Sequence, residues 1–236
     1  MWFEKLMGFK EINPELVRNN IEINDEVMIS KINGKSYQSG ILEVISVAEL
    51  KQKIDIKSFP GKISLAEIVG DVQQLHIAET NRYSLFQAAS QFNLLEMVSP
   101  TVTPERGVGI YENDNTQGPA CAISCGAGTI FRNYFAPVNG KIGQSANNQI
   151  DGLELIGEAL GNKNNLLWKM QNGYCFPSQE GLVEINSILS KLSSAEFEDL
   201  KGLLKVGIQW NTEVTIAENS EQIVSQIYCS ALPIGY

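Results

Sequence analysis

Hydrophobic and polar positions along the chain follow two different spacings, which predicts a mixture of helices and strands. Near the N-terminus, Asn13 and Pro14 predict a short helix over 14–20, because asparagine caps helices and proline fits their first position. The segment 27–44 is strand-like on both sides of Asn33-Gly34, the dipeptide most typical of a tight hairpin turn. This part of the chain therefore predicts a helix followed by a β-hairpin.

Ser46 is placed to cap a further helix that runs to Lys53, and the chain then breaks near Pro60. We therefore expect residues 1–60 to form an N-terminal appendage of helix and hairpin. Residues 61–236 are expected to form the main domain.

Five later segments are rich in apolar or small residues and predict buried strands. They cover 63–70, 85–92, 120–125, 205–216 and 223–232. Helices are expected at 93–98, 151–160, 182–192 and 195–205. Ser193 with Glu196 forms a capping box at the start of the last of these helices. The mixture favours a layered α/β domain.

Composition narrows the class of protein. The 236 residues are 43% hydrophobic and 19% charged, which is enough apolar material for a sizeable core. The net charge of −9 disfavours general nucleic-acid binding, because an acidic surface repels phosphate. No secretory signal or membrane span is expected, so we expect a cytoplasmic protein, or one in the host cytosol if it is a secreted effector.

The four cysteines are expected to be reduced structural thiols, because most of them lie in apolar runs. Cys121 with Cys125 is the one close pair, and the single histidine, His76, is distant in sequence. This spacing is poor for zinc, so we expect no metal.

The first candidate binding residue is Asp71, which follows Gly70 at the expected end of the strand 63–70. Ligands bind beyond strand ends in α/β sheets, and a carboxylate can accept a hydrogen bond from an amine. The alternative is a turn aspartate that binds its own backbone.

A second candidate is the end of the strand 85–92, where small residues would let a ligand approach. Gln91 and Asn93 offer donors and acceptors there, and Phe92 offers an apolar face. Close strand packing followed by an asparagine cap explains the same residues equally well.

The segment 99–119 is rich in Pro, Gly, Thr, Asn and Asp. A loop of this length is uncommon in a compact domain and is often functional. It contains Glu112, Asp114, Thr116 and Gln117, whose side chains can orient a water. A solvated turn is the alternative.

Glycines offer a fourth candidate site. Gly126 and Gly128 follow the expected strand 120–125, and their N–H groups can bind an anion. A close-packed turn is at least as good an explanation, because the run lacks the glycine spacing and the lysine of phosphate-binding motifs.

Together, these segments resemble the macrodomain family. The matching places are Val69-Gly70-Asp71-Val72, 88–93, the Gly-rich loop 107–118, the strand after it at 116–122 and the strand 226–233. The runs Phe86–Glu96 and Asp114–Ala120 are the most specific. They resemble the branch that contains poly(ADP-ribose) glycohydrolases and bacterial effector enzymes that remove ADP-ribose from arginine. The helical segment at about 139–205 would be an insertion.

The resemblance implies a three-layer α/β/α mixed sheet that binds ADP-ribose, with no cofactor. Asp71 and Val72 would lie at the adenine end, and Gln91, Phe92 and Asn93 near the ribose and diphosphate. Further implied ligand contacts come from Gly107, Thr116, Gln117, Gly126 and Gly128.

The resemblance also implies hydrolysis of an ADP-ribosyl linkage through an oxocarbenium-like transition state. Asp114, or else Glu112, would hold the attacking water or a leaving guanidinium, with Asn93 beside them. Two other functions fit the same motifs: a non-catalytic ADP-ribose reader or metabolite binder, and an inactive homologue that serves as an interaction protein.

Macrodomains of this branch close the site with a further strand and a Gly-rich loop, whereas this chain ends at Gly235-Tyr236. We therefore expect a truncated chain, a partner chain that supplies the missing part, or an incomplete site. The expected binding partner is ADP-ribose or an ADP-ribosylated protein.

Overall fold

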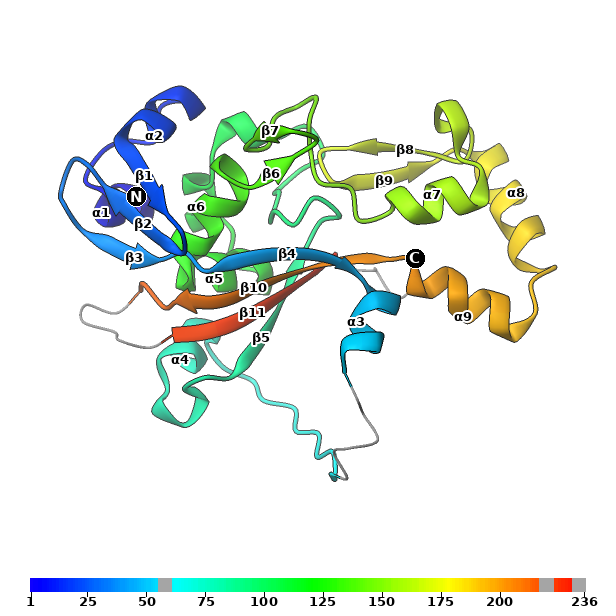
Figure 1. The fold of residues 1–236 in the computed structure, drawn as a ribbon, viewed down its shortest axis with the longest axis horizontal. Coiled ribbons are helices and arrows are strands. Elements are labelled where there is room, and N and C mark those ends of the chain that lie inside the picture. The colour runs from blue at the N-terminus through cyan, green and yellow to red at the C-terminus, as the bar shows by residue number, and fades with distance from the viewer. Residues whose placement is uncertain (55–60, 217–222, 231–236) are drawn as a thin grey trace.

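A computed structural model describes residues 1–54, 61–216 and 223–230 of the chain. At its centre lies a four-stranded sheet in the order β4-β10-β11-β5 (Figure 1). These strands are β4 (Ile41–Ser46), β10 (Lys205–Glu213), β11 (Ile223–Ser230) and β5 (Leu85–Ser90). β10 is antiparallel to both of its neighbours, and β11 pairs in parallel with β5. The expectation of a mixed α/β chain is confirmed, as are the strands predicted at 85–92, 205–216 and 223–232.

The N-terminal segment contains the predicted helix and hairpin. Its elements are α1 (Trp2–Met7), α2 (Pro14–Asn20), β1 (Ile21–Asn24), β2 (Val27–Ser30) and β3 (Ser36–Gln38). The Asn13 side chain caps α2 by accepting a hydrogen bond of 2.8 Å from the Leu16 N–H. Asn33-Gly34 lies in the turn between β2 and β3, and these strands form an antiparallel sheet with β1.

This segment shares its core and its sheet with the rest of the chain. Phe3 and Met7 are fully buried in one apolar cluster with Tyr111, Ile130 and Tyr134. β4 pairs along its whole length with β10, so the expected boundary near residue 60 cuts through the central sheet. The appendage expected over 1–60 is therefore part of the main body.

The capped helices are confirmed. α3 (Val47–Lys53) begins with a capping box between Ser46 and Glu49, and α9 (Ser194–Gly202) with the predicted box between Ser193 and Glu196. α7 (Glu154–Leu160) and α8 (Gln179–Leu189) lie where helices were predicted. The segment 139–205 is only partly helical, because it also contains strands and a 3₁₀ turn. These are β7 (Lys141–Ile142), which pairs with β6 (Pro137–Val138), β8 (Trp168–Gln171), β9 (Tyr174–Pro177) and η5 (Lys163–Asn165).

The strand predicted at 63–70 is wrong. Residues 61–70 run extended without pairing to any described strand, and Ile63 and Val69 are 97% and 99% exposed. α4 (Val72–Ile77) and η2 (Glu79–Asn81) follow. The alternation of apolar residues is that of a strand, but none of the described strands pairs with this segment.

Two other predictions are also wrong. Residues 93–98 form turns and bends instead of a helix, because Asn93 holds the turn with its side chain. The small apolar run 120–125 is helical, within α5 (Gln117–Ser124), and α6 (Gly126–Tyr134) follows directly. Their small residues resemble those of a buried strand, yet they serve close helix packing. The long loop before them contains η3 (Pro104–Arg106) and η4 (Gly109–Asn113).

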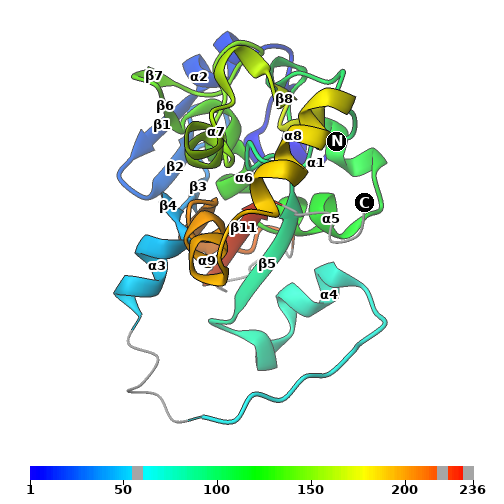
Figure 2. The same cartoon turned by 90° about the vertical axis from the view of Figure 1, so that its right-hand side faces the viewer.

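α5 and α6 lie against one face of the central sheet (Figures 1 and 2). Arg132 of α6 reaches through to Gln209 of β10, with Nη1 donating a hydrogen bond of 2.6 Å to Oε1. α4 lies beside β5, where the His76 ring stacks on Phe86 at 3.9 Å between centroids. This arrangement places the C-terminal end of β5 next to the N-terminus of α5.

Candidate functional site

The runs Phe86–Glu96 and Asp114–Ala120, which the sequence analysis singled out, meet in space. β5 ends at Ser90 and α5 begins at Gln117, and a pocket of about 370 Å³ lies between them. We call this the β5–α5 pocket. Its wall includes Gln91, Glu96, Met97, Asp114, Thr116, Gln117 and Tyr174. The pocket lies beyond the C-terminal end of a strand in a parallel pair, which is where ligands bind in open α/β sheets.

Glu96 is the chemically unusual residue of this pocket. It is 2% exposed, and neither oxygen of its carboxylate accepts a hydrogen bond from the described residues. Burial raises the pKa of this carboxyl to about 7, although the nearby Arg132 guanidinium opposes the shift. A carboxyl with this pKa is partly protonated near neutral pH, which is the property that a general acid and base needs.

The Arg132 guanidinium is held from several sides. It is fully buried, and Nη2 lies 3.6 Å from Oε1 of Glu96. Its Nε donates to the Leu94 carbonyl at 3.1 Å, and Nη2 to the Thr129 hydroxyl at 3.0 Å. With Gln209 as a further acceptor, the guanidinium depends little on Glu96 for its hydrogen bonds.

Asp114 lies on the rim of the pocket in a fixed orientation. One of its oxygens accepts hydrogen bonds from the Thr116 N–H at 2.9 Å and from the Thr116 hydroxyl at 2.6 Å. The hydroxyl of Thr116 is thus engaged, and the side chain does not cap α5. The structure therefore brings Asp114 and Thr116 to one site with Glu96, a residue that sequence reasoning did not single out.

Gln91 and Tyr174 stiffen another part of the wall. Oε1 of Gln91 accepts a hydrogen bond of 2.6 Å from the Met97 N–H, and its Nε2 donates to the Tyr174 hydroxyl at 3.3 Å. That hydroxyl donates in turn to the Met97 carbonyl at 2.6 Å. Burial, followed by the charge of Asp114, raises the pKa of Tyr174, so its hydroxyl stays protonated.

Gln117 has a structural task that also shapes the pocket. Its Oε1 accepts from the Ala89 N–H and its Nε2 donates to the Gln87 carbonyl, both at 2.9 Å. The amide group therefore imitates a neighbouring strand on the outer edge of β5. Next to it, a Cβ at Gly118 would lie 2.3 Å from the Ala89 carbonyl oxygen, so only glycine lets α5 approach this closely.

Asn93 and Phe92 belong to the scaffold. The Asn93 side chain is fully buried, accepts from the Leu95 N–H at 3.1 Å and donates to Gln149 at 2.9 Å. Phe92 is 8% exposed and packs in an apolar cluster with Trp168. Neither residue lines the β5–α5 pocket. Their proposed contact with a ligand, and a catalytic role for Asn93, is not supported by this arrangement.

The place of the ligand contact expected at Gly107 is occupied by a side chain of the protein, Glu11. Glu11 places its carboxylate against the Val108 N–H at 2.9 Å and the Gly109 N–H at 2.6 Å. The Tyr134 hydroxyl donates to the same carboxylate at 2.8 Å. A Cβ at Gly107 would lie 2.5 Å from the carboxyl carbon of Glu11. The glycine therefore makes room for an internal carboxylate, and a ligand phosphate has no access to these N–H groups.

Gly126 and Gly128 are packing residues. Both are buried in α6, and the Gly126 N–H donates to the Thr215 hydroxyl at 2.9 Å. A Cβ at Gly128 would lie 2.7 Å from the Thr212 side chain. This packing does not support the anion-binding role expected for these two residues, and they pack closely in a helix instead of the turn that was the alternative.

Asp71 follows the alternative of a local cap. Its side chain accepts a hydrogen bond of 2.8 Å from the Gln73 N–H and begins α4, with Val72 as the first helical residue. Neither residue lines the β5–α5 pocket. Because residues 61–70, directly before Asp71, form no strand, Asp71 does not lie at a strand end.

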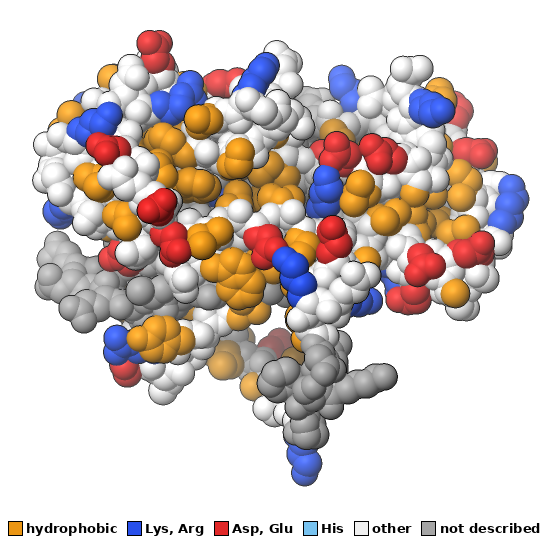
Figure 3. All heavy atoms as spheres, viewed as in Figure 1, with side chains coloured by type: hydrophobic (Ala, Val, Ile, Leu, Met, Phe, Trp, Pro, Cys, Tyr) orange, Lys and Arg blue, Asp and Glu red, His pale blue; other side chains and the backbone are white. Residues whose placement is uncertain are grey.

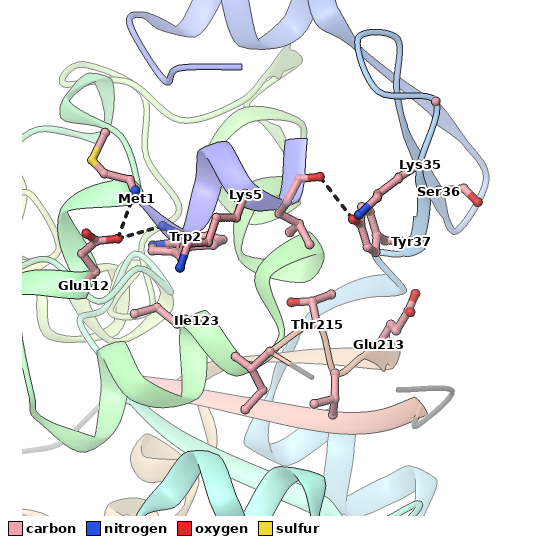
Figure 4. A pocket seen from close by; sticks show the side chains of 14 residues that line it. Met1, Trp2, Lys5, Lys35, Ser36, Tyr37, Glu112, Ile123, Glu213 and Thr215 are labelled. Atoms are coloured by element: carbon pink, nitrogen blue, oxygen red, sulfur yellow. Dashed lines mark hydrogen bonds and ion pairs between the residues drawn. The ribbon is translucent and has the colours of Figure 1, made fainter. Parts of the chain in front are cut away.

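Glu112 lies in a different and larger hollow of about 1000 Å³, between α1, β3 and the end of β10 (Figure 4). Its Oε2 accepts a hydrogen bond of 2.7 Å from the Trp2 N–H and lies 4.0 Å from the N-terminal amine. The other carboxylate there, Glu213, accepts from the Gln38 N–H at 2.8 Å. Both carboxylates are engaged in structural contacts. We therefore place the candidate chemistry in the smaller β5–α5 pocket, where the Glu96 carboxylate accepts no hydrogen bond from the described residues.

The described part of the chain contains no cluster of three or more His, Cys, Asp or Glu side chains that could hold a metal ion. Cys121 and Cys175 are free thiols. Among the described helices, none has the length and apolar character of a membrane span.

Sequence reasoning missed Glu96 and Arg132, although one signal marks both. Each is a charged residue next to apolar ones: Glu96 lies within Leu94-Leu95-Glu96-Met97, and Arg132 follows Ile130-Phe131. Charged side chains are almost never fully buried unless they are paired, so two such residues predict a buried pair. Comparison of the chain with protein-family models, with curated proteins and with solved structures found no match.

Proposed function

We propose that the β5–α5 pocket hydrolyses the glycosidic bond of an ADP-ribosyl group, with Glu96 as the residue that transfers the proton. The observation that carries this proposal is a fully buried carboxyl without a hydrogen-bond partner in a pocket wall. Because burial raises its pKa to about 7, Glu96 holds a proton to donate to a leaving group and can take one back from water.

Asp114 is the second carboxyl that glycoside hydrolysis requires. Thr116 holds one of its oxygens, so the other can face an attacking water or a positively charged group. The described wall contains two carboxyl groups and neither Lys nor Arg. This charge pattern suits a cationic leaving group such as the guanidinium of ADP-ribosyl-arginine.

The start of α5 supports the phosphate side of the same substrate. Thr116 uses its hydroxyl on Asp114, so the first N–H groups of α5 lack a side-chain cap. Helix N-termini of this kind favour anions. The volume of about 370 Å³ is near the lower end for ligand pockets, which run from about 300 to 1000 Å³, and it suits one ribose with its adjoining groups.

The macrodomain-like, three-layer form of the fold is part of this proposal. It is supported by the parallel pair β5–β11 and by a pocket at the C-terminal end of β5. A cytoplasmic location is proposed as well, and the free thiols of Cys121 and Cys175 fit a reducing compartment.

The test is incubation with a peptide ADP-ribosylated on arginine, with release of ADP-ribose as the measurement. Glu96→Gln and Asp114→Asn should each lower the rate by about 100-fold or more, because general acid–base catalysis contributes about 10² to 10⁴. Glu180→Gln, an exposed change on α8, is the matched control and should retain the full rate. No release by the wild-type protein, or equal rates in all variants, would sink the assignment.

Calorimetry with free ADP-ribose separates hydrolysis from reading. If the protein is a hydrolase, it should bind ADP-ribose and release it from the peptide, and Glu96→Gln should abolish the release. Binding that survives both substitutions, with no turnover in any variant, would identify a reader instead. Absence of binding and of turnover would leave an interaction protein.

A further inference from the structure

The segment 61–70 is the most exposed apolar stretch of the described chain. Ile63, Leu65 and Val69 are 97%, 98% and 99% exposed. Figures 1 and 2 show this segment as an extended trace that runs out from the body before it returns at α4. Soluble proteins rarely leave so much apolar side chain in water unless the surface binds something.

The sequence of this segment is that of a strand. Ile63, Leu65 and Val69 share one face of an extended chain, because side chains alternate between the two faces. The opposite face includes Ile68, which is 69% exposed. A strand of this kind is stabilised when its backbone pairs with a sheet edge and its apolar face is covered.

The central sheet has one edge that can receive it. On the β5 side, the Gln117 amide already occupies the edge. On the other side β4 is the last strand, and no described strand pairs with its outer edge (Figure 2). Beside that edge, Ile41 and its cross-strand partner Trp210 are 50% and 38% exposed. Figure 3 shows exposed apolar side chains over this part of the molecule.

The segment cannot pair fully with β4 of its own copy. α4 lies beside β5, so a strand outside β4 would be separated from β5 by four strand spacings, about 19 Å in total. From Val69 to Val72 the chain has three Cα steps, which reach at most about 11 Å. Full pairing through Val69 would therefore pull α4 away from β5.

We propose that residues 61–70 of one copy pair as a fifth strand on the outer edge of β4 in a second copy, and that the exchange is reciprocal. Each chain carries both the unpaired strand and the unpaired edge, so two copies satisfy each other in a closed two-fold dimer. β4 spans the six residues Ile41–Ser46, so the stretch from Ile63 to Val69 is long enough to pair along its whole length. The exchange covers Ile41 and Trp210 at the same time.

The first test is the molar mass of the full chain by light scattering over a range of concentrations. The expected mass is twice the 26.0 kDa of one chain. Leu65→Asp and Val69→Asp should give monomers with unchanged melting, because neither side chain contributes to the core of one copy. Ile12→Asp, at a residue that is 70% exposed elsewhere on the surface, should leave the dimer intact. A wild-type monomer at all concentrations, or dimers that tolerate the two aspartates, would overturn the proposal.

A cysteine cross-link tests whether residues 61–70 pair with β4 of a second copy or with β4 of their own copy. Chains with Val44→Cys, in β4, are mixed with chains that carry Leu65→Cys, and the mixture is oxidised. A disulfide-linked dimer of the two different chains is expected, whereas a mixture with Ile12→Cys in place of Leu65→Cys should give none. A doubly substituted chain that cross-links only within itself, at the mass of a monomer, would show pairing within one copy and contradict the exchange.

Discussion

Nη2 of Arg132 lies 3.6 Å from Oε1 of Glu96, and both side chains are buried. The guanidinium donates its hydrogen bonds to neutral acceptors, at Leu94, Thr129 and Gln209. Glu96 therefore receives the field of a nearby positive charge without receiving a hydrogen bond from it. The pair leaves a carboxyl that is costly to ionise and hence useful for proton transfer.

This relationship predicts how stability depends on pH. Burial raises the pKa of Glu96 from 4.5 to about 7, so between these values the folded chain binds more protons than the unfolded chain. The stabilisation is therefore fully present below pH 4.5 and is lost as pH rises towards 7, by about 3 kcal/mol in total. Glu96→Gln removes this dependence. Urea unfolding from pH 4.5 to 8 should show the variant gaining on the wild type as pH rises, and parallel curves would contradict the raised pKa.

Removal of the Arg132 charge should lower the stability of the fold more than removal of the Glu96 charge does. Arg132→Met leaves Glu96 buried without a charge partner and three acceptors without their donor, and we expect a loss of about 3 to 5 kcal/mol in the free energy of unfolding at pH 8. Adding Glu96→Gln to that variant should restore part of the loss, because the uncompensated charge is gone. Denaturant unfolding of the single and double variants measures this coupling. A double variant no more stable than Arg132→Met alone would show that the two charges do not interact.

Local signals predicted much of the fold. The caps at Asn13, Ser46 and Ser193 are confirmed, since a capping side chain bonds to a backbone group within three residues and needs no tertiary contact. The Asn33-Gly34 turn is confirmed for the same reason. Failures occurred where a partner distant in sequence decides the outcome. The small residues of 120–125 suit a buried strand or a closely packed helix, and contact with β5 selects the helix.

The candidate site was predicted only in part, for a similar reason. The sequence brought forward Gln91, Asp114, Thr116 and Gln117, and the structure places all four around one pocket. It could not reveal that the backbone N–H groups after Gly107 bind the Glu11 carboxylate, because these residues are far apart along the chain. Burial of Glu96 is likewise a tertiary property, and its apolar neighbours were the one local sign of it.

The close contact between Glu11 and the backbone at Gly107 predicts a large loss of stability when Gly107 is substituted. The glycine has φ 85° and ψ 176°, a region that costs other residues about 1 to 3 kcal/mol, and an added Cβ also collides with the Glu11 carboxylate. Gly107→Ala should therefore destabilise the fold by about 3 kcal/mol or more. Gly161→Ala is the control, with φ 75° but open space around the new Cβ, and should cost only about 1 to 2 kcal/mol.

Glu11→Gln tests whether the carboxylate is the reason. Alone, it should destabilise the chain by about 1 to 3 kcal/mol, because buried donors lose a charged acceptor. In a chain that already carries Gly107→Ala, Glu11→Gln should lower the stability much less, because the contact between Glu11 and the N–H groups is already disrupted. Thermal and denaturant unfolding of the four variants measure the cycle, and strictly additive losses would separate Gly107 from Glu11.

The bonds between Gln117 and β5 predict a local change without loss of the fold. Gln117→Ala removes the acceptor of the Ala89 N–H, and a hydrogen bond of about 1 kcal/mol corresponds to roughly fivefold faster exchange of that amide. Gln117→Glu keeps an acceptor for this N–H but loses the donor to the Gln87 carbonyl, so the Ala89 amide should stay protected. Hydrogen exchange followed by NMR measures both variants, with Gln52→Ala on the exposed side of α3 as a control that should change nothing. Equal exchange at Ala89 in the wild type and in Gln117→Ala would show that water, and not the side chain, satisfies the edge of β5.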